Sequence, residues 1–269
     1  MHRIVITGAS DGIGAEMARQ LAQTHQSQLQ LTLAARNADN LQAVARLCEA
    51  HGTQVLVQPT DVSAEAQCRT LIAEAVRRFD GIDVLINNAG ISAHALLEEV
   101  SAQDLNWYEQ LMRINLWGSV WCTHAALPHL KASKGAIVAV SSLAGLIGVP
   151  GRTAYSASKF AMTGFFEALR AELKPAGVSV TLAYPGVVAT QIRNRGYNAK
   201  GVAAGVSGLK EDKAMSVEEC ARLIIRGMNQ RQREVVMDKG KLGRLLKLVA
   251  PGVVENMALA ALKDDVKPH

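Results

Sequence analysis

Seven short apolar runs, rich in β-branched residues and leucine, recur along this chain of 269 residues, and longer stretches with helical periodicity separate them. Such a run is typical of a strand buried on both faces, and a helix between two of them makes a crossover connection. The pattern predicts an α/β fold, a doubly wound parallel sheet with helices on both faces. The predicted strands are Ile4–Ile6, Leu29–Leu33, Val55–Val57, Val84–Ile86, Ile137–Val140, Val178–Leu182 and Val235–Met237.

The chain is long enough, and at 49% hydrophobic residues apolar enough, to bury a large core in one domain. We expect this single domain to span residues 1–238. A lid is expected at about residues 190–215, around the glycine-rich stretch Gly196–Gly208. Residues 239–269 are expected to form an amphipathic C-terminal extension.

Several classes of protein are disfavoured. Met1 leads within a few residues to the first strand, without the basic and long apolar regions of a signal peptide. The four cysteines lie far apart and form no C-x-x-C pair, which favours reduced thiols in the cytosol. The longest uncharged stretches, 114–130 and 135–151, are too short and too polar for a membrane span. We therefore expect a cytoplasmic protein, and no metal-binding pattern is present.

The first predicted strand runs into the glycine-rich turn T-G-A-S-D-G-I-G, residues 7–14, and a helix follows. Glycine lets the backbone of such a turn approach a pyrophosphate, and the amides at the helix N-terminus face the phosphates. The spacing of Gly8, Gly12 and Gly14 departs from G-x-G-x-x-G, and an ordinary loop is the alternative. Its position between a strand and a helix favours a dinucleotide site.

The second predicted strand ends in Leu33-Ala34-Ala35-Arg36-Asn37, where a dinucleotide-binding chain places the residue that contacts the adenosine ribose. An acidic residue there is typical of NAD binding, and none is present. Arg36 offers a planar set of donors suited to a 2′-phosphate, so NADP(H) is favoured. The alternative is that Arg36 only faces solvent or caps the next helix.

Polar and turn-forming residues follow three later strands: Asn87-Asn88-Ala89-Gly90, Ser141-Ser142 and Pro185-Gly186. The carboxyl ends of parallel strands meet at one edge, where open sheets bind ligands. Each segment alone also suits a turn or a helix cap.

Tyr155 and Lys159 lie four residues apart, so both side chains project from one face of a predicted helix. A lysine ammonium favours the phenolate form of a neighbouring tyrosine, which suits Tyr155 for proton transfer. Alone, the spacing is more often a solvated surface pair.

Together these motifs resemble the short-chain dehydrogenase/reductase family, over nearly the whole length, with its Rossmann fold. The resemblance implies that Tyr155 is the general acid/base and that Ser142, 13 residues before it, binds the substrate oxygen. It implies that Asn115 helps hold a water relay to Lys159. The implied cofactor-binding residues are Gly8, Ser10, Asp11, Gly12, Ile13, Gly14, Arg36, Asp61, Val62, Asn88, Ala89, Gly90, Tyr155, Lys159, Pro185, Gly186, Val188 and Thr190.

The implied activity is oxidoreduction between a ketone or aldehyde and an alcohol, with NADP(H). The residues expected to line the substrate pocket are mostly apolar, which favours an apolar substrate. They are His94, Ser142, Leu143, Val187 and Ile192. The alternative function is a non-catalytic NADP(H)-binding sensor or scaffold. Because only 4% of residues are aromatic and none cluster near the basic segment 226–247, we expect no nucleic-acid binding.

The C-terminal extension is basic and amphipathic, with Leu242, Leu245, Leu246 and Val249 on one predicted helix face. It suits either peripheral contact with the inner face of a membrane or packing on protein. The resemblance also implies a homodimer or homotetramer formed through the helix at 114–130 and the helix that carries Tyr155.

Overall fold

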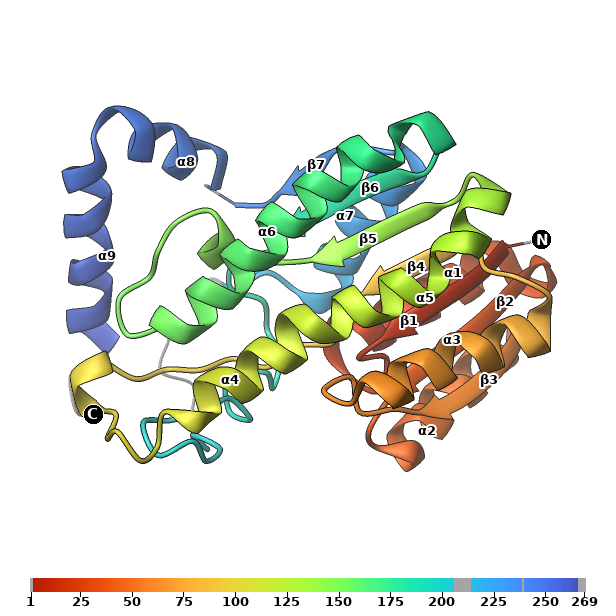
Figure 1. The fold of residues 1–269 in the computed structure, drawn as a ribbon, viewed down its shortest axis with the longest axis horizontal. Coiled ribbons are helices and arrows are strands. Elements are labelled where there is room, and N and C mark those ends of the chain that lie inside the picture. The colour runs from red at the N-terminus through yellow and green to blue at the C-terminus, as the bar shows by residue number, and fades with distance from the viewer. Residues whose placement is uncertain (1, 206–213, 239, 266–269) are drawn as a thin grey trace.

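The seven predicted strands are confirmed, and they form one parallel sheet in the order β3-β2-β1-β4-β5-β6-β7 (Figure 1). The computed structural model describes residues 2–205, 214–238 and 240–265. Strand ends differ by up to two residues from those predicted. Pairing continues past most of the apolar runs, whereas Val178 and Met237 lie just outside the paired segments. The strands are β1 His2–Thr7, β2 Leu29–Ala35, β3 Gln54–Pro59, β4 Val84–Asn87, β5 Ala136–Val140, β6 Ser179–Tyr184 and β7 Glu234–Val236.

Helices cover both faces of the sheet. One apolar core joins the sheet to α1, α2 and α7, and a second joins it to α3, α5 and α6, which cross the sheet on the viewer's side of Figure 1. The helices are α1 Gly12–His25, α2 Ala38–Glu49, α3 Glu65–Phe79, α4 Asn106–Met112, α5 Gly118–Ser133, α6 Thr153–Leu173, α7 Val217–Asn229, α8 Gly240–Val249 and α9 Pro251–Asp265.

The first helix shows how local sequence sets these boundaries. The Asp11 side chain caps α1 by accepting a hydrogen bond from the Gly12 amide at 2.7 Å, which satisfies one of the free amides of the first turn. Met17 and Leu21, four residues apart, are fully buried against the sheet. The helix therefore begins directly after the glycine-rich turn and points its N-terminus at the sheet edge.

The strand order reverses direction beside β1, which pairs with β2 on one side and with β4 on the other. The connections from β1 and β4 therefore leave in opposite directions and open a crevice at the carboxyl edge. The turn after β1 and the loop after β4 form the two walls of this crevice.

The C-terminal helices α8 and α9 lie beyond β7, at the end of the sheet (Figure 1). They contact the loop that connects β5 to α6, since Gly243 lies beside Ile147 and Gly151 beside Leu262. Within the described residues no helix is long and apolar enough to cross a membrane. Of the lid predicted at 190–215, residues 206–213 lie outside the described part.

A pair of glycine-to-alanine substitutions tests how tightly the turn after β1 is packed. A Cβ atom at Gly14 would overlap the Gly8 carbonyl oxygen and lie 2.5 Å from Asn88 Nδ2. We expect Gly14→Ala to lower the free energy of unfolding by about 1–3 kcal/mol in urea titrations.

Gly164→Ala in α6 is the matched control, because nothing lies within 4 Å of its Cβ position. Alanine is the better helix former there, so we expect a gain of about 0.5–1 kcal/mol. If Gly14→Ala and Gly164→Ala changed the free energy of unfolding by the same amount, the close packing around Gly14 would be refuted.

Candidate functional site

The turn after β1 depends on glycine at two kinds of position. Gly8 and Gly12 have φ angles of +66° and +53°, in the left-handed region that favours glycine. Gly14 has an ordinary helical backbone but is pressed against Gly8 and Asn88. The backbone is thus left uncovered by side chains, as close approach to a phosphate group requires.

Thr7 ties this turn to the loop after β4. Its hydroxyl accepts hydrogen bonds from the amides of Asn88 and Ala89 at 3.0 and 3.1 Å and donates to the Ile86 carbonyl at 3.3 Å. Asn88 Nδ2 donates in return to the carbonyl oxygens of Thr7 and Gly8. The sequence analysis assigned no role to Thr7, because its partners lie about eighty residues away along the chain.

A groove of about 750 Å³ runs along the crevice, a volume within the usual range for small-molecule sites. Arg36 lies exposed at its far end, and an ion pair of 2.8 Å between Asp11 and Arg195 lies beside the glycine turn. Most of the cofactor-binding residues implied by the motifs come together here. The groove is lined by Gly8, Ser10, Asp11, Gly12, Ile13, Arg36, Asp61, Val62, Asn88, Ala89, Gly90 and Thr190.

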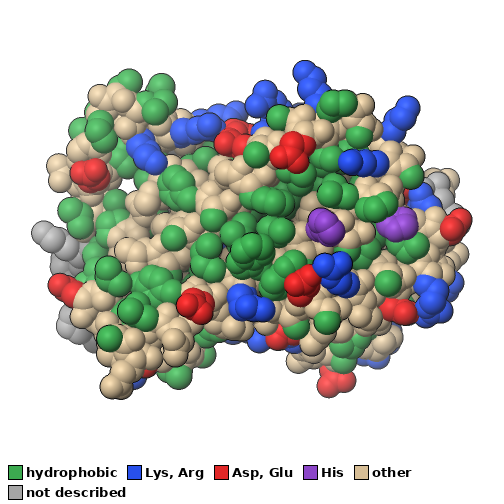
Figure 2. Space-filling view, in the orientation of Figure 1, with side chains coloured by type: hydrophobic (Ala, Val, Ile, Leu, Met, Phe, Trp, Pro, Cys, Tyr) green, Lys and Arg blue, Asp and Glu red, His purple; other side chains and the backbone are tan. Residues whose placement is uncertain are grey.

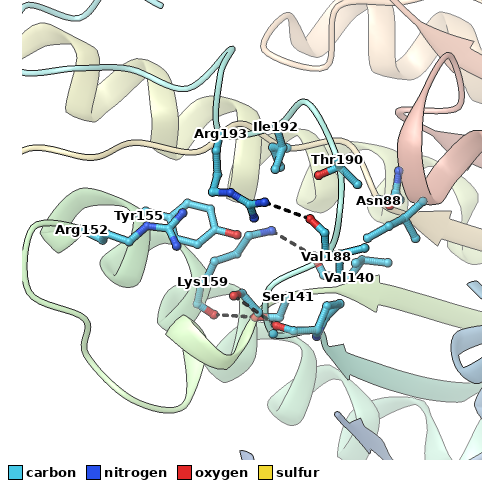
Figure 3. A pocket seen from close by; sticks show the side chains of 15 residues that line it. Asn88, Val140, Ser141, Arg152, Tyr155, Lys159, Val188, Thr190, Ile192 and Arg193 are labelled. Atoms are coloured by element: carbon cyan, nitrogen blue, oxygen red, sulfur yellow. Dashed lines mark hydrogen bonds between the residues drawn. The ribbon is translucent and has the colours of Figure 1, made fainter. Parts of the chain in front are cut away.

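A second, smaller cavity of about 80 Å³ adjoins this groove and shares Ile13, Asn88, Gly90, Thr190 and Ile192 with it. Figure 3 shows Tyr155 and Lys159 converging on it from α6. Of the residues implied for substrate or cofactor, the cavity is lined by Ile13, Asn88, Gly90, Ser142, Tyr155, Lys159, Pro185, Gly186, Val188, Thr190 and Ile192.

Lys159 is buried beside Tyr155, with its ammonium 5.8 Å from the centre of the tyrosine ring. The ammonium donates to the Val140 carbonyl oxygen at 3.0 Å (Figure 3). Burial lowers the pKa of the Lys159 ammonium, and the charge of Tyr155 acts in the opposite direction. The Lys159 amine is therefore held at the inner wall of the cavity, in surroundings where burial disfavours its charged form and Tyr155 favours it.

The two serines after β5 occupy different environments. Ser141 is buried, and its hydroxyl donates to the Lys159 carbonyl oxygen in α6 at 3.2 Å. Ser142 is half-buried, and its hydroxyl accepts from the Ala144 amide at 3.2 Å. Both line the cavity; the Ser141 hydroxyl bonds α6, and the Ser142 hydroxyl also donates to the Pro185 carbonyl oxygen at 3.4 Å.

Asn115 connects the loop after β4 to α6. It lies in a single π-helical turn, Arg113–Trp117, between α4 and α5. Its Oδ1 accepts from the Ile91 amide at 2.8 Å, and its Nδ2 donates to the Ile91 carbonyl and to Ser158 Oγ. Asn115 therefore lies behind the cavity wall rather than in its lining.

Three residues expected in the substrate pocket lie outside the lining of this cavity. Leu143 packs under Gly186 and Gly240, and His94 lies beside Gly151. Val187 is half-buried next to the lining residues Gly186 and Val188.

Two arginines that the sequence analysis missed line the cavity instead (Figure 3). The Arg152 guanidinium stacks on the Tyr155 ring, 4.5 Å from its centre, and its Nη2 donates to Ser92 Oγ. Arg193 Nη2 donates to the Val188 carbonyl at 3.2 Å. Arg152 directly precedes α6 and belongs to none of the motifs, so no sequence signal indicated that its guanidinium stacks on the Tyr155 ring.

Residues 2–200 match the sequence profile of the family described as short chain dehydrogenase. The chain belongs to this family. An 11-beta-hydroxysteroid dehydrogenase-like protein 4A from Arabidopsis thaliana is 39% identical over 226 residues, which cover 84% of this chain and 72% of that protein. The match confirms the resemblance drawn from the motifs and shows that the chain belongs to a family of oxidoreductases.

Two solved structures of the family share the fold. An alcohol dehydrogenase from the archaeon Thermococcus sibiricus, complexed with 5-hydroxy-NADP, is 26% identical with a TM-score of 0.75, over 88% of this chain and 96% of that chain. A family member from Burkholderia phymatum in complex with NAD is also 26% identical, with a TM-score of 0.78, over 93% and 94%. These neighbours bind different dinucleotides.

The Thr7 hydroxyl provides a test of the connection between the two walls of the groove. Thr7→Val keeps the shape of the side chain and leaves two amides without an acceptor, so we expect the free energy of unfolding to fall by about 1–3 kcal/mol. Nucleotide affinity, followed by fluorescence titration, is expected to fall as well. Thr7→Ser, which keeps the hydroxyl, should retain most of the stability and most of the nucleotide affinity. A Thr7→Val protein as stable as the parent chain would contradict the role given to Thr7.

Proposed function

We propose that this chain is an NADP(H)-dependent oxidoreductase that interconverts a ketone or aldehyde and an alcohol on an apolar substrate, with Tyr155 as general acid/base. The observation that carries the proposal is that Ser142, Tyr155 and Lys159 line one cavity, and that this cavity adjoins the dinucleotide groove. When bound, the nicotinamide supplies or accepts the hydride.

Each residue of the cavity has a task in reduction. Negative charge builds on the carbonyl oxygen in the transition state, and the Ser142 and Tyr155 hydroxyls are donors that stabilise it. Tyr155 then transfers its proton to that oxygen. The Lys159 ammonium favours the resulting phenolate, and Asn115 holds the adjacent loop and supports the water relay that returns the proton. Oxidation of an alcohol uses the same groups in reverse.

The preference for NADP(H) over NAD(H) rests on Arg36. It lies exposed directly after β2 and lines the groove next to Asn37 and Asn40. A guanidinium there forms charge-assisted hydrogen bonds with a 2′-phosphate, whereas the ribose diol of NAD gains less.

The apolar substrate is supported by Ile192 and Val188 in the cavity. A catalytic role is favoured over a sensor or scaffold because a binding protein has no need to bring Ser142, Tyr155 and Lys159 to one cavity. The lid at 190–215 and the domain division at residue 238 stay predictions.

A homodimer or homotetramer, working in the cytoplasm, completes the proposal. Apolar side chains gather over α5 and α6 in Figure 2. On these helices and the turn before them, Trp117 stacks on Trp121 and is 46% exposed, and Phe160 is 37% exposed. Such a patch is typical of a subunit interface.

Replacing Tyr155 tests the proton transfer. Tyr155→Phe removes the hydroxyl and keeps the ring, so we expect kcat to fall by about 100-fold to 10,000-fold while NADPH still binds. Tyr108→Phe in α4 is the matched control, because Tyr108 lies outside the cavity lining and should leave kcat nearly unchanged. A Tyr155→Phe enzyme with near-normal turnover would overturn the assignment.

Replacing Arg36 tests the cofactor preference. We expect Arg36→Leu to lower kcat/KM for NADPH by about 10-fold to 100-fold, because a charge-assisted hydrogen bond to the 2′-phosphate is lost. The value for NADH should change little. Arg46→Leu, an exposed arginine of α2, is the control and should alter neither value. A parent enzyme that prefers NADH would refute the role of Arg36.

A further inference from the structure

The two C-terminal helices carry much of the exposed apolar surface of the molecule. Among the described residues thirteen large hydrophobic side chains are exposed, and seven of them belong to α8 and α9. We call this surface the outer face of α8–α9. It consists of Leu242, Leu245, Leu248, Val249, Val253, Met257 and Leu259.

Helix α8 lies on the domain with its apolar side turned outward. Its inner side includes Gly240 and Gly243, where an added Cβ atom would lie 2.7 Å from Val236 Cγ1 and 2.8 Å from Ile147 Cδ1 respectively. Of the four residues predicted on the apolar face, Leu246 is half-buried and the other three are exposed. Leu242 and Leu248 are 63% and 77% exposed. A helix that docks on its own domain buries its apolar side. Because the glycines of α8 face the domain, Leu242 and Leu248 point away from it and can contact a surface outside this chain.

The charges of α8 indicate what that surface is. Helix α8 contains Lys241, Arg244 and Lys247 and no acidic residue. Arg244 forms an ion pair with Glu234, and Lys247 donates to the Leu146 carbonyl and lies over the Phe160 ring. These contacts hold both cations against the domain at the edge of the exposed leucines, and Lys241 is exposed. Figure 2 shows Lys and Arg side chains close to the apolar side chains at this end of the molecule.

We propose that the outer face of α8–α9 docks on the surface of an anionic lipid bilayer. An amphipathic helix lies in the interface with its leucines among the acyl chains and its cations at the headgroups. Helix α8 offers its exposed leucines and the exposed Lys241 for this, with Arg244 and Lys247 at the edge next to the domain. A second copy of the chain is less suited to cover this face, because a two-fold contact through α8 would oppose two sets of cations.

The inner side of the same helices contacts the loop that precedes the helix of Tyr155. Gly240 packs on Leu143, Gly243 lies beside Ile147, and Leu262 lies beside Gly151. These partners belong to the connection between Ser142 and Tyr155. Docking would therefore hold the cavity next to the bilayer, where apolar molecules are concentrated; this consequence, unlike the docking itself, rests on the proposed function.

Vesicle flotation of the full-length protein tests the docking. We expect it to float with vesicles of phosphatidylcholine and phosphatidylglycerol, and to bind pure phosphatidylcholine vesicles about tenfold more weakly, because the cations of α8 favour anionic headgroups. The double substitution Leu245→Glu with Leu248→Glu should abolish flotation. Leu47→Glu is the matched control, since Leu47 is an exposed leucine of α2 at 53% and should have no effect.

Nucleotide binding by each variant shows that the fold is retained. Failure of the parent protein to float, or equal flotation of the double variant, would overturn the docking proposal. Light scattering of the same samples tests whether a second copy of the chain covers this face instead. If the parent protein is an oligomer that does not bind vesicles, and the double variant is a monomer, the face belongs to a subunit interface. Turnover of a water-soluble carbonyl compound is independent of flotation, so failure of the docking and failure of the oxidoreductase proposal are distinguishable.

Discussion

The contact between the turn after β1 and the loop after β4 is the constraint on which the rest of the site depends. The two segments meet where the strand order reverses, and they approach so closely that Gly14 has no room for a side chain. The Thr7 hydroxyl and the Asn88 amide hold them together with four hydrogen bonds. This contact leaves backbone amides uncovered at the helix N-terminus, which is what an anionic pyrophosphate needs.

The same contact also fixes the proton-transfer side of the site. Beyond Ala89 the loop is held by Asn115, which bonds Ile91 through both side-chain atoms and donates to Ser158 at 2.9 Å. Ser158 in turn donates to the Tyr155 carbonyl oxygen at 2.8 Å. These hydrogen bonds and the short segment Ala89–Ile91 together connect β1 to α6, and they position Tyr155 and Lys159 relative to the dinucleotide groove.

The sequence predicted the fold well because buried parallel strands are continuous apolar runs, whose ends alone were uncertain by one or two residues. It also predicted the strand-end motifs, because all such ends share one edge of the sheet. Thr7 was missed because its partners are distant along the chain. Arg152 was missed because it precedes α6 and no motif includes it. Periodicity revealed the apolar side of α8 but not that Gly240 and Gly243 turn it outward.

The most direct measurement of the central claim follows the nicotinamide absorbance while the protein is supplied with NADPH or NADH and a series of aliphatic, aromatic and steroid ketones. The structure and the proposed roles of Arg36 and Tyr155 predict that NADPH is oxidised as an apolar ketone is reduced to its alcohol, and that NADH is a poorer donor. Absence of turnover with every ketone, and with the matching alcohols and the oxidised cofactors, would contradict the account.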